Sequence, residues 1–177
     1  MIAKDYIIRR FEENDLAFLY IALKKIEGRR PLDEGYFERC WQEQEQDKRV
    51  VFIAISEDGV CGYIQLIFKP AYQMFCTLGI PEIQDLNVIP ETRCKGVGNA
   101  LVEYCEQYIH NLGGTELGIG VGLYKSYGAA QRLYARRGYL PDGMGIVYDN
   151  QPVLCGDFRP VDDQLCLKLV KDLTGIQ

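Results

Sequence analysis

The chain has 177 residues and 47% of them are hydrophobic, so it is the size of one domain and can bury a continuous core without disulfide or metal staples. Its net charge of -5 argues against a nucleic-acid binder, which usually needs a basic face to neutralise phosphates. A single histidine and the lack of any Cys-x-x-Cys pair argue against a zinc site, and we expect no metal.

The sequence shows no sign of a boundary between domains. No linker, repeat or low-complexity tract interrupts it, which predicts a single domain over residues 1–177. The first residues lack the basic segment and apolar run of a signal peptide, and no stretch approaches the length of a membrane span, so we expect a cytoplasmic protein without a membrane partner. The seven cysteines form an odd set that we expect to be reduced, mostly buried and structural.

The first predicted element is a short strand over residues 6–10. A helix follows, with Asn14 as its cap, apolar residues at helical spacing over 16–26, and Gly28 at its end. A second helix is predicted to begin at Asp33, and one face of it carries Tyr36, Phe37, Cys40 and Trp41.

Two β-rich runs come next, over residues 49–56 and 60–69. The turn residues Glu57-Asp58-Gly59 between them predict a hairpin. A loop is expected over 71–79, and it leads to a strand over 80–89 that the following proline stops.

In the second half, helices and strands alternate. A long helix that ends at the Gly113-Gly114 pair precedes a strand over 116–121, and a further helix is predicted over 127–137. Another strand starts at Tyr139. Beyond a stretch rich in glycine, proline and aspartate, the apolar run 165–171 alternates in part and predicts a closing strand at the edge of the sheet.

The most informative segment joins the strand over 80–89 to the long helix, and its sequence is Arg93-Cys94-Lys95-Gly96-Val97-Gly98-Asn99. The first amides of a helix have no intrahelical acceptor, and together with the helix dipole they attract anions. Gly96 and Gly98 let the chain approach a diphosphate closely, and Arg93 or Lys95 can add a cationic contact. Taken alone, two glycines at a helix start are equally well explained as a tight turn.

Two ordered motifs make the prediction more specific. The strand Ile83-Gln84-Asp85-Leu86-Asn87-Val88, a proline and then Arg93-x-x-Gly96-x-Gly98 resemble the Arg/Gln-x-x-Gly-x-Gly/Ala signature of the GNAT N-acetyltransferase family. The run Ala130-Gln131-Arg132-Leu133-Tyr134-Ala135-Arg136-Arg137-Gly138-Tyr139 is similar to the helix and strand of the family's second motif. The resemblance is firm over about residues 49–140 and thin beyond residue 141. Neither the third glycine of a dinucleotide fingerprint nor the Lys-Ser/Thr of a Walker loop is present.

The resemblance implies an α/β fold with a mixed, strongly twisted central sheet. The sheet is expected to have about six or seven strands, four flanking helices and a splay between its fourth and fifth strands, where the pantetheine arm of acetyl-CoA lies like an added strand. By resemblance, the main chain of Leu86, Asn87 and Val88 meets the pantetheine amides, and the amides from Cys94 to Asn99 surround the diphosphate. The expected cosubstrate is therefore acetyl-CoA.

The implied reaction is direct acetyl transfer to an amine through a tetrahedral intermediate. An ammonium group must lose a proton before it attacks a thioester, so a carboxylate must accept that proton, directly or through water. Glu82 aligns with the general-base glutamate of one branch of the family, and Asp85 lies three residues on. Strand alternation places the two on opposite faces unless a bulge intervenes, so we expect one of them to face the substrate. Each is also explained as a solvated or paired strand residue.

Tyr134 matches the family tyrosine that gives a proton or hydrogen bond to the leaving thiolate, so the resemblance makes it both catalytic and cofactor-binding. Its helical spacing also fits an aromatic packing residue. Cys94 lies at the mouth of the loop, and we expect it to contribute only its backbone amide and to form no acyl-enzyme.

The chain departs from the family pattern on its fifth strand. Some relatives carry a carboxylate there, and this sequence has Gly118-Ile119-Gly120-Val121-Gly122. Gly120 and Gly122 can leave space for the pantetheine or the acceptor, or they can mark a bulge. Tyr127 occupies a position where many relatives carry an asparagine.

The acceptor stays open. In this family its pocket is formed mostly by the segments equivalent to 27–36 and 143–160, which here mix acids, aromatics and bases, so a small-molecule amine, an amino acid or a peptide terminus all fit. The alternative from another class is a catalytically silent acyl-CoA-binding regulatory module, and a third is a structural protein with a fortuitous glycine loop. Dimers are common in the family, and a homodimer could form through the last strand.

Overall fold

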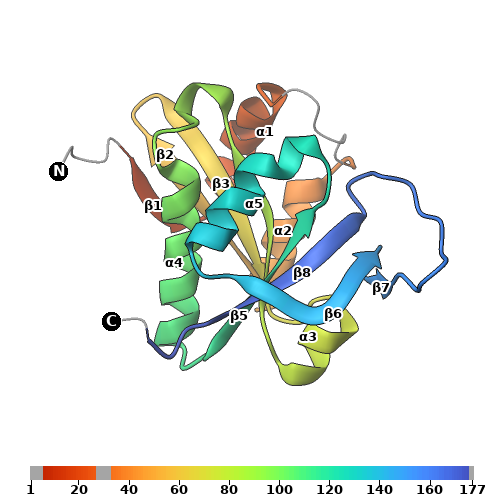
Figure 1. Cartoon of the computed structure of the whole chain (residues 1–177). Coiled ribbons are helices and arrows are strands. Elements are labelled where there is room, and N and C mark those ends of the chain that lie inside the picture. The colour runs from red at the N-terminus through yellow and green to blue at the C-terminus, as the bar shows by residue number, and fades with distance from the viewer. Residues whose placement is uncertain (1–5, 27–32, 176–177) are drawn as a thin grey trace. The chain divides into compact units, whose positions relative to one another are not determined.

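A computed structural model describes residues 6–26 and 33–175 of the chain (Figure 1). These residues fall into two compact units, each built from separate stretches of chain. The first unit contains the described residues up to Ile67 together with Gln84–Cys105. The second contains Phe68–Ile83 and the described residues from Glu106 onward.

The sheet of the first unit has the strand order β1-β2-β3-β4. Here β1 (Ile7–Arg10) and β3 (Gly59–Ile67) pair antiparallel with the two sides of β2 (Arg49–Ser56). The strands β2 and β3 form the predicted hairpin, with Ser56 opposite Gly59 at its turn. The middle of both strands is buried, which explains why both appear in the sequence as continuous apolar runs.

Helices α1 (Leu16–Lys24) and α2 (Tyr36–Glu45) bury their apolar residues in one core with these strands. The largest fully buried members of that core are Phe11, Leu19, Phe37, Ile53 and Tyr63. The hydrophobic spacing that predicted both helices therefore corresponds to a real buried face.

The predicted starts of both helices are wrong. Asn14 lies inside a short 3-10 turn, η1 (Glu13–Asp15), where the Asp15 carboxylate accepts the Glu12 main-chain N–H at 2.8 Å. The second helix begins at Tyr36 and not at Asp33, because Gly35 has a left-handed φ of 69°. The predicted end of the first helix at Gly28 lies outside the described residues.

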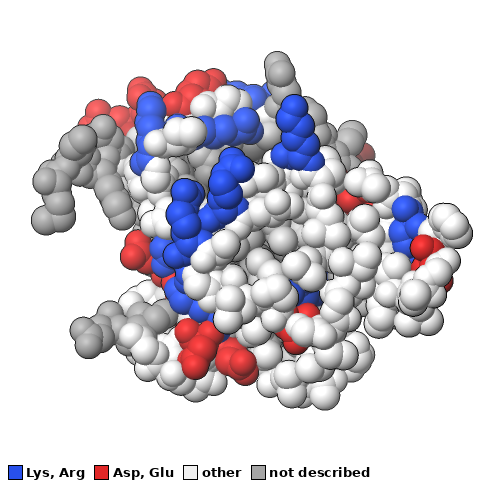
Figure 2. Space-filling model, in the orientation of Figure 1, with Lys and Arg blue, Asp and Glu red and all other residues white. Residues whose placement is uncertain are grey.

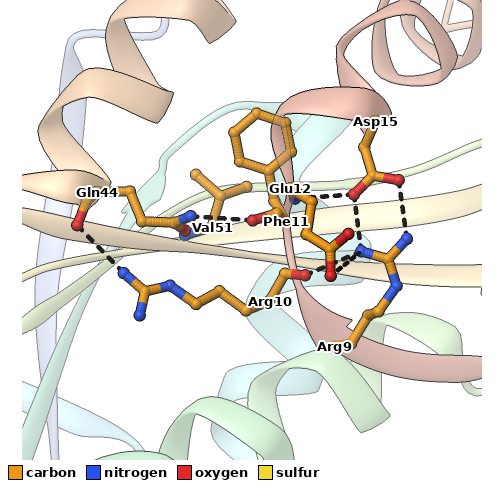
Figure 3. Close-up of polar contacts among 7 residues, drawn as sticks. All are labelled: Arg9, Arg10, Phe11, Glu12, Asp15, Gln44 and Val51. Atoms are coloured by element: carbon orange, nitrogen blue, oxygen red, sulfur yellow. Dashed lines mark hydrogen bonds and ion pairs between the residues drawn. The ribbon is translucent and has the colours of Figure 1, made fainter.

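The C-terminal end of α2 is fastened to the sheet by Gln44, a buried amide (Figure 3). Its Nε2 donates to the carbonyl oxygen of Phe11 at 2.9 Å, and its Oε1 accepts the main-chain N–H of Val51 at 3.0 Å. Arg10 donates to the main-chain carbonyl of Gln44 at 3.1 Å. Because the partners of the amide lie on β2 and directly after β1, it ties α2 to β2 and to the end of β1.

After β4 (Glu82–Val88) the chain forms η2 (Pro90–Thr92) and α4 (Val97–Asn111). The helix α4 starts in the first unit and ends in the second. Leu101 is buried, whereas Tyr104 and Leu112 are 37% and 62% exposed, so the buried face of this helix is narrower than its set of apolar residues.

Four complete strands belong to the second unit: β5 (Glu116–Gly122), β6 (Leu140–Tyr148), β7 (Gln151–Pro152) and β8 (Leu165–Asp172). The last strand lies between β5 and β6 and is antiparallel to both. The prediction of an edge strand is therefore wrong, and so is the idea that this strand pairs with a second copy, because both of its sides are already paired. The short β7 lies at the edge.

Helix α3 (Gln73–Leu78) falls in a segment predicted to be a loop. Six residues are too few to show a helical period in the sequence. Helix α5 (Gly128–Arg136) follows the short η3 (Lys125–Tyr127) and buries Tyr134, in agreement with the predicted helix.

The pairing of strands is mixed, as predicted. The parallel ladder between β4 and β5 comprises Glu82 with Gly118 and Ile83 with Ile119, and the other ladders described above are antiparallel. The described part of the chain has eight strands and five α-helices where six or seven and four were expected, because β7 and α3 are too short to predict.

None of the helices in the described residues is long and apolar enough to cross a membrane. All seven cysteines are free. The expectation that most are buried is wrong, since Cys76, Cys94 and Cys155 are exposed and only Cys40, Cys61 and Cys105 are buried.

Candidate active site

The loop between η2 and α4 contains residues in the left-handed region directly before a helix N-terminus. Cys94 and Gly96 have left-handed φ angles of 59° and 84°, and a Cβ at Gly96 would have no protein atom within 4 Å. At the start of α4 the Ala100 N–H donates to the Gly96 carbonyl at 2.9 Å, and the amides of Val97 and Gly98 belong to the first turn of the helix. Left-handed residues ahead of a helix N-terminus suit a phosphate group, and the diphosphate site in this loop stays a prediction.

This loop is attached to the end of β4 and to β3. Arg93 Nε donates to the Val88 carbonyl at 3.1 Å, and Thr92 Oγ1 donates to the Cys61 carbonyl at 2.9 Å. Arg93, Cys94, Lys95 and Asn99 are all exposed, whereas Val97 is buried and anchors the first turn of α4 in the core. The loop thus presents main-chain amides and basic side chains to solvent from a fixed base.

The segment of β4 predicted to meet the pantetheine amides runs close to β3. A Cβ at Gly62 would lie 2.6 Å from the carbonyl oxygen of Asn87 and 3.2 Å from Cα of Val88. Leu86, Asn87 and Val88 are half-buried. Only a glycine on β3 allows this approach of the two backbones.

Asp85 interrupts the regular geometry of β4, because its φ is 56° in the middle of the strand. Strand alternation placed Glu82 and Asp85 on opposite faces unless a bulge intervened, and Asp85 is such an irregularity. Alternation therefore no longer predicts which face each side chain occupies. The two carboxylates have different partners. Asp85 interacts with α2 and β3, and Glu82 with β8.

Three donors converge on one oxygen of Asp85, and all belong to the first unit. Tyr36 donates its hydroxyl proton to Oδ2 at 2.6 Å, Gln65 Nε2 donates at 3.1 Å, and the Tyr63 hydroxyl lies at 3.5 Å. Burial, followed by the charge of Asp85, raises the pKa of Tyr36, so this hydroxyl keeps its proton and acts as a donor. Asp85 itself is half-buried, and its carboxylate oxygen accepts these hydrogen bonds.

The surroundings of Glu82 differ from those of Asp85. Its side chain is 1% exposed, and Lys168 Nζ donates to its Oε1 at 2.5 Å from a side chain that is 5% exposed. Lys168 also donates to Asn150 Oδ1 at 2.9 Å and lies 5.2 Å from the centre of the Tyr72 ring. Because a buried lysine neutralises its charge, we interpret the Glu82 carboxylate as a structural group.

The glycines of β5 have neighbours in the second unit. A Cβ at Gly122 would lie 2.5 Å from the Tyr127 ring, and one at Gly118 would lie 2.3 Å from the Phe75 ring. A Cβ at Gly120 would lie 3.3 Å from Lys168 Nζ. The space that Gly122 was expected to leave for a ligand is therefore occupied by an aromatic ring, which also accounts for Tyr127 at the start of the second motif.

Tyr134 is the buried residue of α5 and is 5% exposed. Burial raises its pKa, so its hydroxyl is a proton donor across the neutral range. Basic side chains gather in the region of this helix (Figure 2). Arg132 and Arg136 of α5 are exposed. The inward residue of α5 is thus a protonated phenol and its outward residues are cationic.

Sequence reasoning missed two parts of the site. The partners of Asp85, which are Tyr36, Tyr63 and Gln65, lie 20 to 49 residues away along the chain and left no local pattern. Lys168 did leave a signal, because a lysine inside the apolar run 165–171 indicates a buried charge that needs a partner.

Comparison with known proteins gives one sequence match. A model of the acetyltransferase (GNAT) family matches residues 16–139, which include the loop before α4 and the whole of α5. No curated protein sequence matches the chain significantly.

Solved structures give many matches at low identity. A GNAT-family acetyltransferase described as putative, from Desulfovibrio desulfuricans, has a TM-score of 0.71 at 16% identity over 95% of this chain and 99% of its own. A ribosomal-protein-alanine N-acetyltransferase from Brucella melitensis has a TM-score of 0.69 at 17% identity, with 94% and 99% covered. A spermidine N-acetyltransferase from Vibrio cholerae, solved with CoA and spermine, has a TM-score of 0.66 at 16% identity, with 96% of each chain covered. At identities this low, the structural matches establish a shared fold and nothing more.

Proposed function

The chain belongs to the acetyltransferase (GNAT) family, and from that membership we propose that it transfers the acetyl group of acetyl-CoA directly to an amine of a small molecule or peptide. As a family member it is an acyltransferase, and acetyl-CoA is its cosubstrate. The observation that carries the proposal is the family match itself, because residues 16–139 take in both the loop before α4 and Tyr134.

The loop over residues 93–99 is the proposed site of the CoA diphosphate. The left-handed Gly96 and the amides of Val97 and Gly98 suit an anion, and Arg93 and Lys95 supply positive charge. The main chain of Leu86, Asn87 and Val88 is proposed to bind the pantetheine amides. This part of the assignment depends on the resemblance and on the close backbone approach that Gly62 permits.

Acetyl-CoA supplies a thioester whose carbonyl carbon accepts the amine. The reaction needs an acceptor for the ammonium proton before the nitrogen–carbon bond forms, and a donor to the sulfur as the carbon–sulfur bond breaks. We assign the first role to Asp85, which is half-buried, and the second to Tyr134, whose raised pKa keeps its hydroxyl protonated. Glu82 is then a structural residue, because Lys168 already neutralises it in a buried pair.

Three further expectations belong to the proposal. The two units together make one acetyltransferase domain, which is supported by a family match that crosses both of them. The seven free cysteines favour the cytoplasm, where disulfides are rare. A homodimer would use a surface other than β8, and light scattering after size-exclusion chromatography would measure it.

The test is release of free CoA thiol from acetyl-CoA with a panel of amines, followed by mass detection of the acetylated product. Spermidine and a peptide with N-terminal alanine belong in the panel, because two structural neighbours are named for such acceptors. The matched variant is Gly96→Asp, which places a negative side chain at a left-handed position in the loop and should abolish both CoA binding and turnover.

The outcomes separate the candidate functions. Amine-dependent thiol release that Gly96→Asp abolishes supports the acetyltransferase. Thermal stabilisation by CoA without turnover across the panel would instead support a silent acyl-CoA-binding module, and no stabilisation at all would support a structural protein.

A further inference from the structure

A series of hydrogen bonds leads from Arg49, the first residue of β2, to the carboxylate of Asp85. It consists of Arg49, Gln65, Tyr36 and Asp85, and we call these four residues the Asp85 network. Arg49 Nη1 donates to Gln65 Oε1 at 2.5 Å, Gln65 Nε2 donates to the Tyr36 hydroxyl at 2.8 Å, and Tyr36 donates to Asp85 Oδ2 at 2.6 Å. All four residues lie in the first unit.

The chemistry of the side chains determines which group donates each of these hydrogen bonds. An arginine side chain can only donate, so the oxygen of the Gln65 amide must face Arg49 and its NH2 group must face Tyr36. Because the Tyr36 oxygen accepts from that NH2 group, its own proton points to Asp85. The same NH2 group also reaches Asp85 Oδ2 directly at 3.1 Å. Each hydrogen bond along this path is thus donated in the direction of Asp85, and Tyr36 and Gln65 both donate to its Oδ2.

The outer end of the network is also fixed. Arg49 forms an ion pair with Glu43 of α2, and its side chain is 20% exposed. Gln65 is buried, with 1% of its surface exposed, so a change of its orientation would leave polar atoms without partners. Tyr36 lies in the first turn of α2, and Gln44 fastens the last turn of the same helix to β1 and β2 (Figure 3). The helix that carries Tyr36 is therefore held at both ends.

We propose that Tyr36, Gln65 and Arg49 are positioning residues that fix the orientation of the Asp85 carboxylate for the acceptor amine. This inference depends on the proposed acetyl transfer to an amine. In the step concerned, an N–H bond of the acceptor ammonium breaks, its proton passes to the Asp85 carboxylate, and the nitrogen keeps the electron pair with which it attacks. Since three donors share Oδ2 and a carboxylate is planar, they determine where Oδ1 lies as well.

The first test compares two tyrosines in the same unit. Tyr36→Phe removes the hydroxyl that donates to Asp85, and Tyr20→Phe removes a hydroxyl that donates to Glu38 at 2.5 Å outside the network. With the best acceptor of the amine panel, Tyr36→Phe should lower kcat/KM by about 10- to 100-fold, the range expected for a hydrogen bond to a charged group. Tyr20→Phe should change it by less than about twofold, and CoA affinity should be the same in both. Equal kinetics for the two variants would overturn the proposal.

A double-mutant cycle separates positioning from general loss of structure. If Tyr36 acts through Asp85, then adding Tyr36→Phe to Asp85→Asn should lower kcat/KM by no more than about twofold. A second full loss in the double variant would mean that Tyr36 acts independently of Asp85, and the proposal would fail. Arg49→Lys should repeat part of the Tyr36→Phe effect, because lysine cannot donate to Gln65 and Glu43 with the same planar geometry.

A crystal structure of Tyr36→Phe gives a readout that does not need an acceptor. The Asp85 carboxylate is expected to turn or to occupy more than one rotamer, and a single unchanged orientation would refute positioning. Lack of turnover by the wild-type protein with every amine would instead refute the proposed function. The two failures are therefore distinguishable.

Discussion

Tyrosine hydroxyls are paired with carboxylates at several places in this chain. Tyr36 donates to Asp85, Tyr20 to Glu38 and Tyr148 to Asp162. In each case the pKa of the tyrosine is raised: burial is the largest cause for Tyr36 and Tyr20, and the hydrogen bond to Asp162 is the largest for Tyr148. Such tyrosines stay protonated and orient the carboxylate that they contact.

Tyr134 differs from these tyrosines because burial is the one cause of its raised pKa, with no contribution from a carboxylate. Its Tyr134→Phe variant should lose turnover by at least about tenfold, and up to the roughly 10²- to 10⁴-fold that proton donors contribute, while CoA affinity stays within about twofold. The measurements are kcat from thiol release and the Kd of CoA from calorimetry. Wild-type turnover in this variant would remove the role assigned to the hydroxyl.

The buried pair of Glu82 and Lys168 should matter for folding more than for chemistry. Glu82→Gln leaves the Lys168 ammonium buried without its counter-charge, so the free energy of unfolding should fall by about 3–5 kcal/mol. Replacing both residues, with Glu82→Gln and Lys168→Met, should recover part of that loss. Urea unfolding of the two variants measures both effects. A Glu82→Gln protein that is stable but inactive would show instead that Glu82 is the base.

At the scale of the elements, close backbone packing determines where glycine occurs in the strands. Gly118 and Gly122 of β5 face the rings of Phe75 and Tyr127, and Gly62 of β3 faces the main chain of Asn87. None of the three has a left-handed φ, so the requirement is for space and not for backbone freedom. Of the two glycines of β5 considered as room for a ligand, Gly122 instead accommodates an aromatic ring and Gly120 lies next to Lys168.

Gly62→Ala tests the link between this packing and the cofactor. The new methyl group would lie 2.6 Å from the Asn87 carbonyl, so β4 must shift at the residues proposed to bind pantetheine. We expect a loss of about 1–3 kcal/mol in stability and weaker CoA binding. Gly128→Ala is the control, because the atom nearest to its new methyl group would be Arg132 Nη1, at an ordinary contact distance of 3.5 Å. Unchanged CoA affinity in Gly62→Ala would argue against a cofactor contact at this point of β4.

At the scale of the whole molecule, each unit contains a buried carboxylate whose pKa is lowered. Burial acts to raise the pKa of Asp15 in the first unit, but hydrogen bonds from Arg9 and the Glu12 amide outweigh it. Burial likewise opposes the lowered pKa of Glu106 in the second unit, where Arg137 and Lys171 donate to it. Both groups bind protons more weakly in the folded state than in the unfolded state.

Acid should therefore destabilise the protein. A lowered folded pKa contributes stability above the unfolded values, about 3.9 for Asp and about 4.3 for Glu, and the contribution is lost as pH falls through the folded pKa. We expect the urea midpoint to be nearly constant between pH 6 and pH 7 and to fall steeply below about pH 4.

Glu106→Gln provides the matched variant for this acid effect. It should lower the free energy of unfolding at pH 7 by about 3 kcal/mol or more and should reduce the difference between pH 7 and pH 3. The same pH dependence in the variant and the wild type would show that Glu106 does not cause the acid sensitivity.

The sequence by itself determined the features that depend on a short stretch of chain. The hairpin of β2 and β3, the amphipathic α4 and α5, and the glycine loop before α4 each follow from fewer than 20 neighbouring residues, whose periodicity and turn chemistry are local. The two family motifs are local in the same sense, which is why the family could be predicted.

Only the tertiary structure decided which distant residues meet. Lys168 and Glu82 are 86 residues apart, and Tyr36 and Asp85 are 49 apart. The place of β8 between two strands also could not be predicted, because a half-buried strand has the same alternation at an edge as inside a sheet. Periodicity specifies which face of an element is buried, but it carries no information about the partner that buries it.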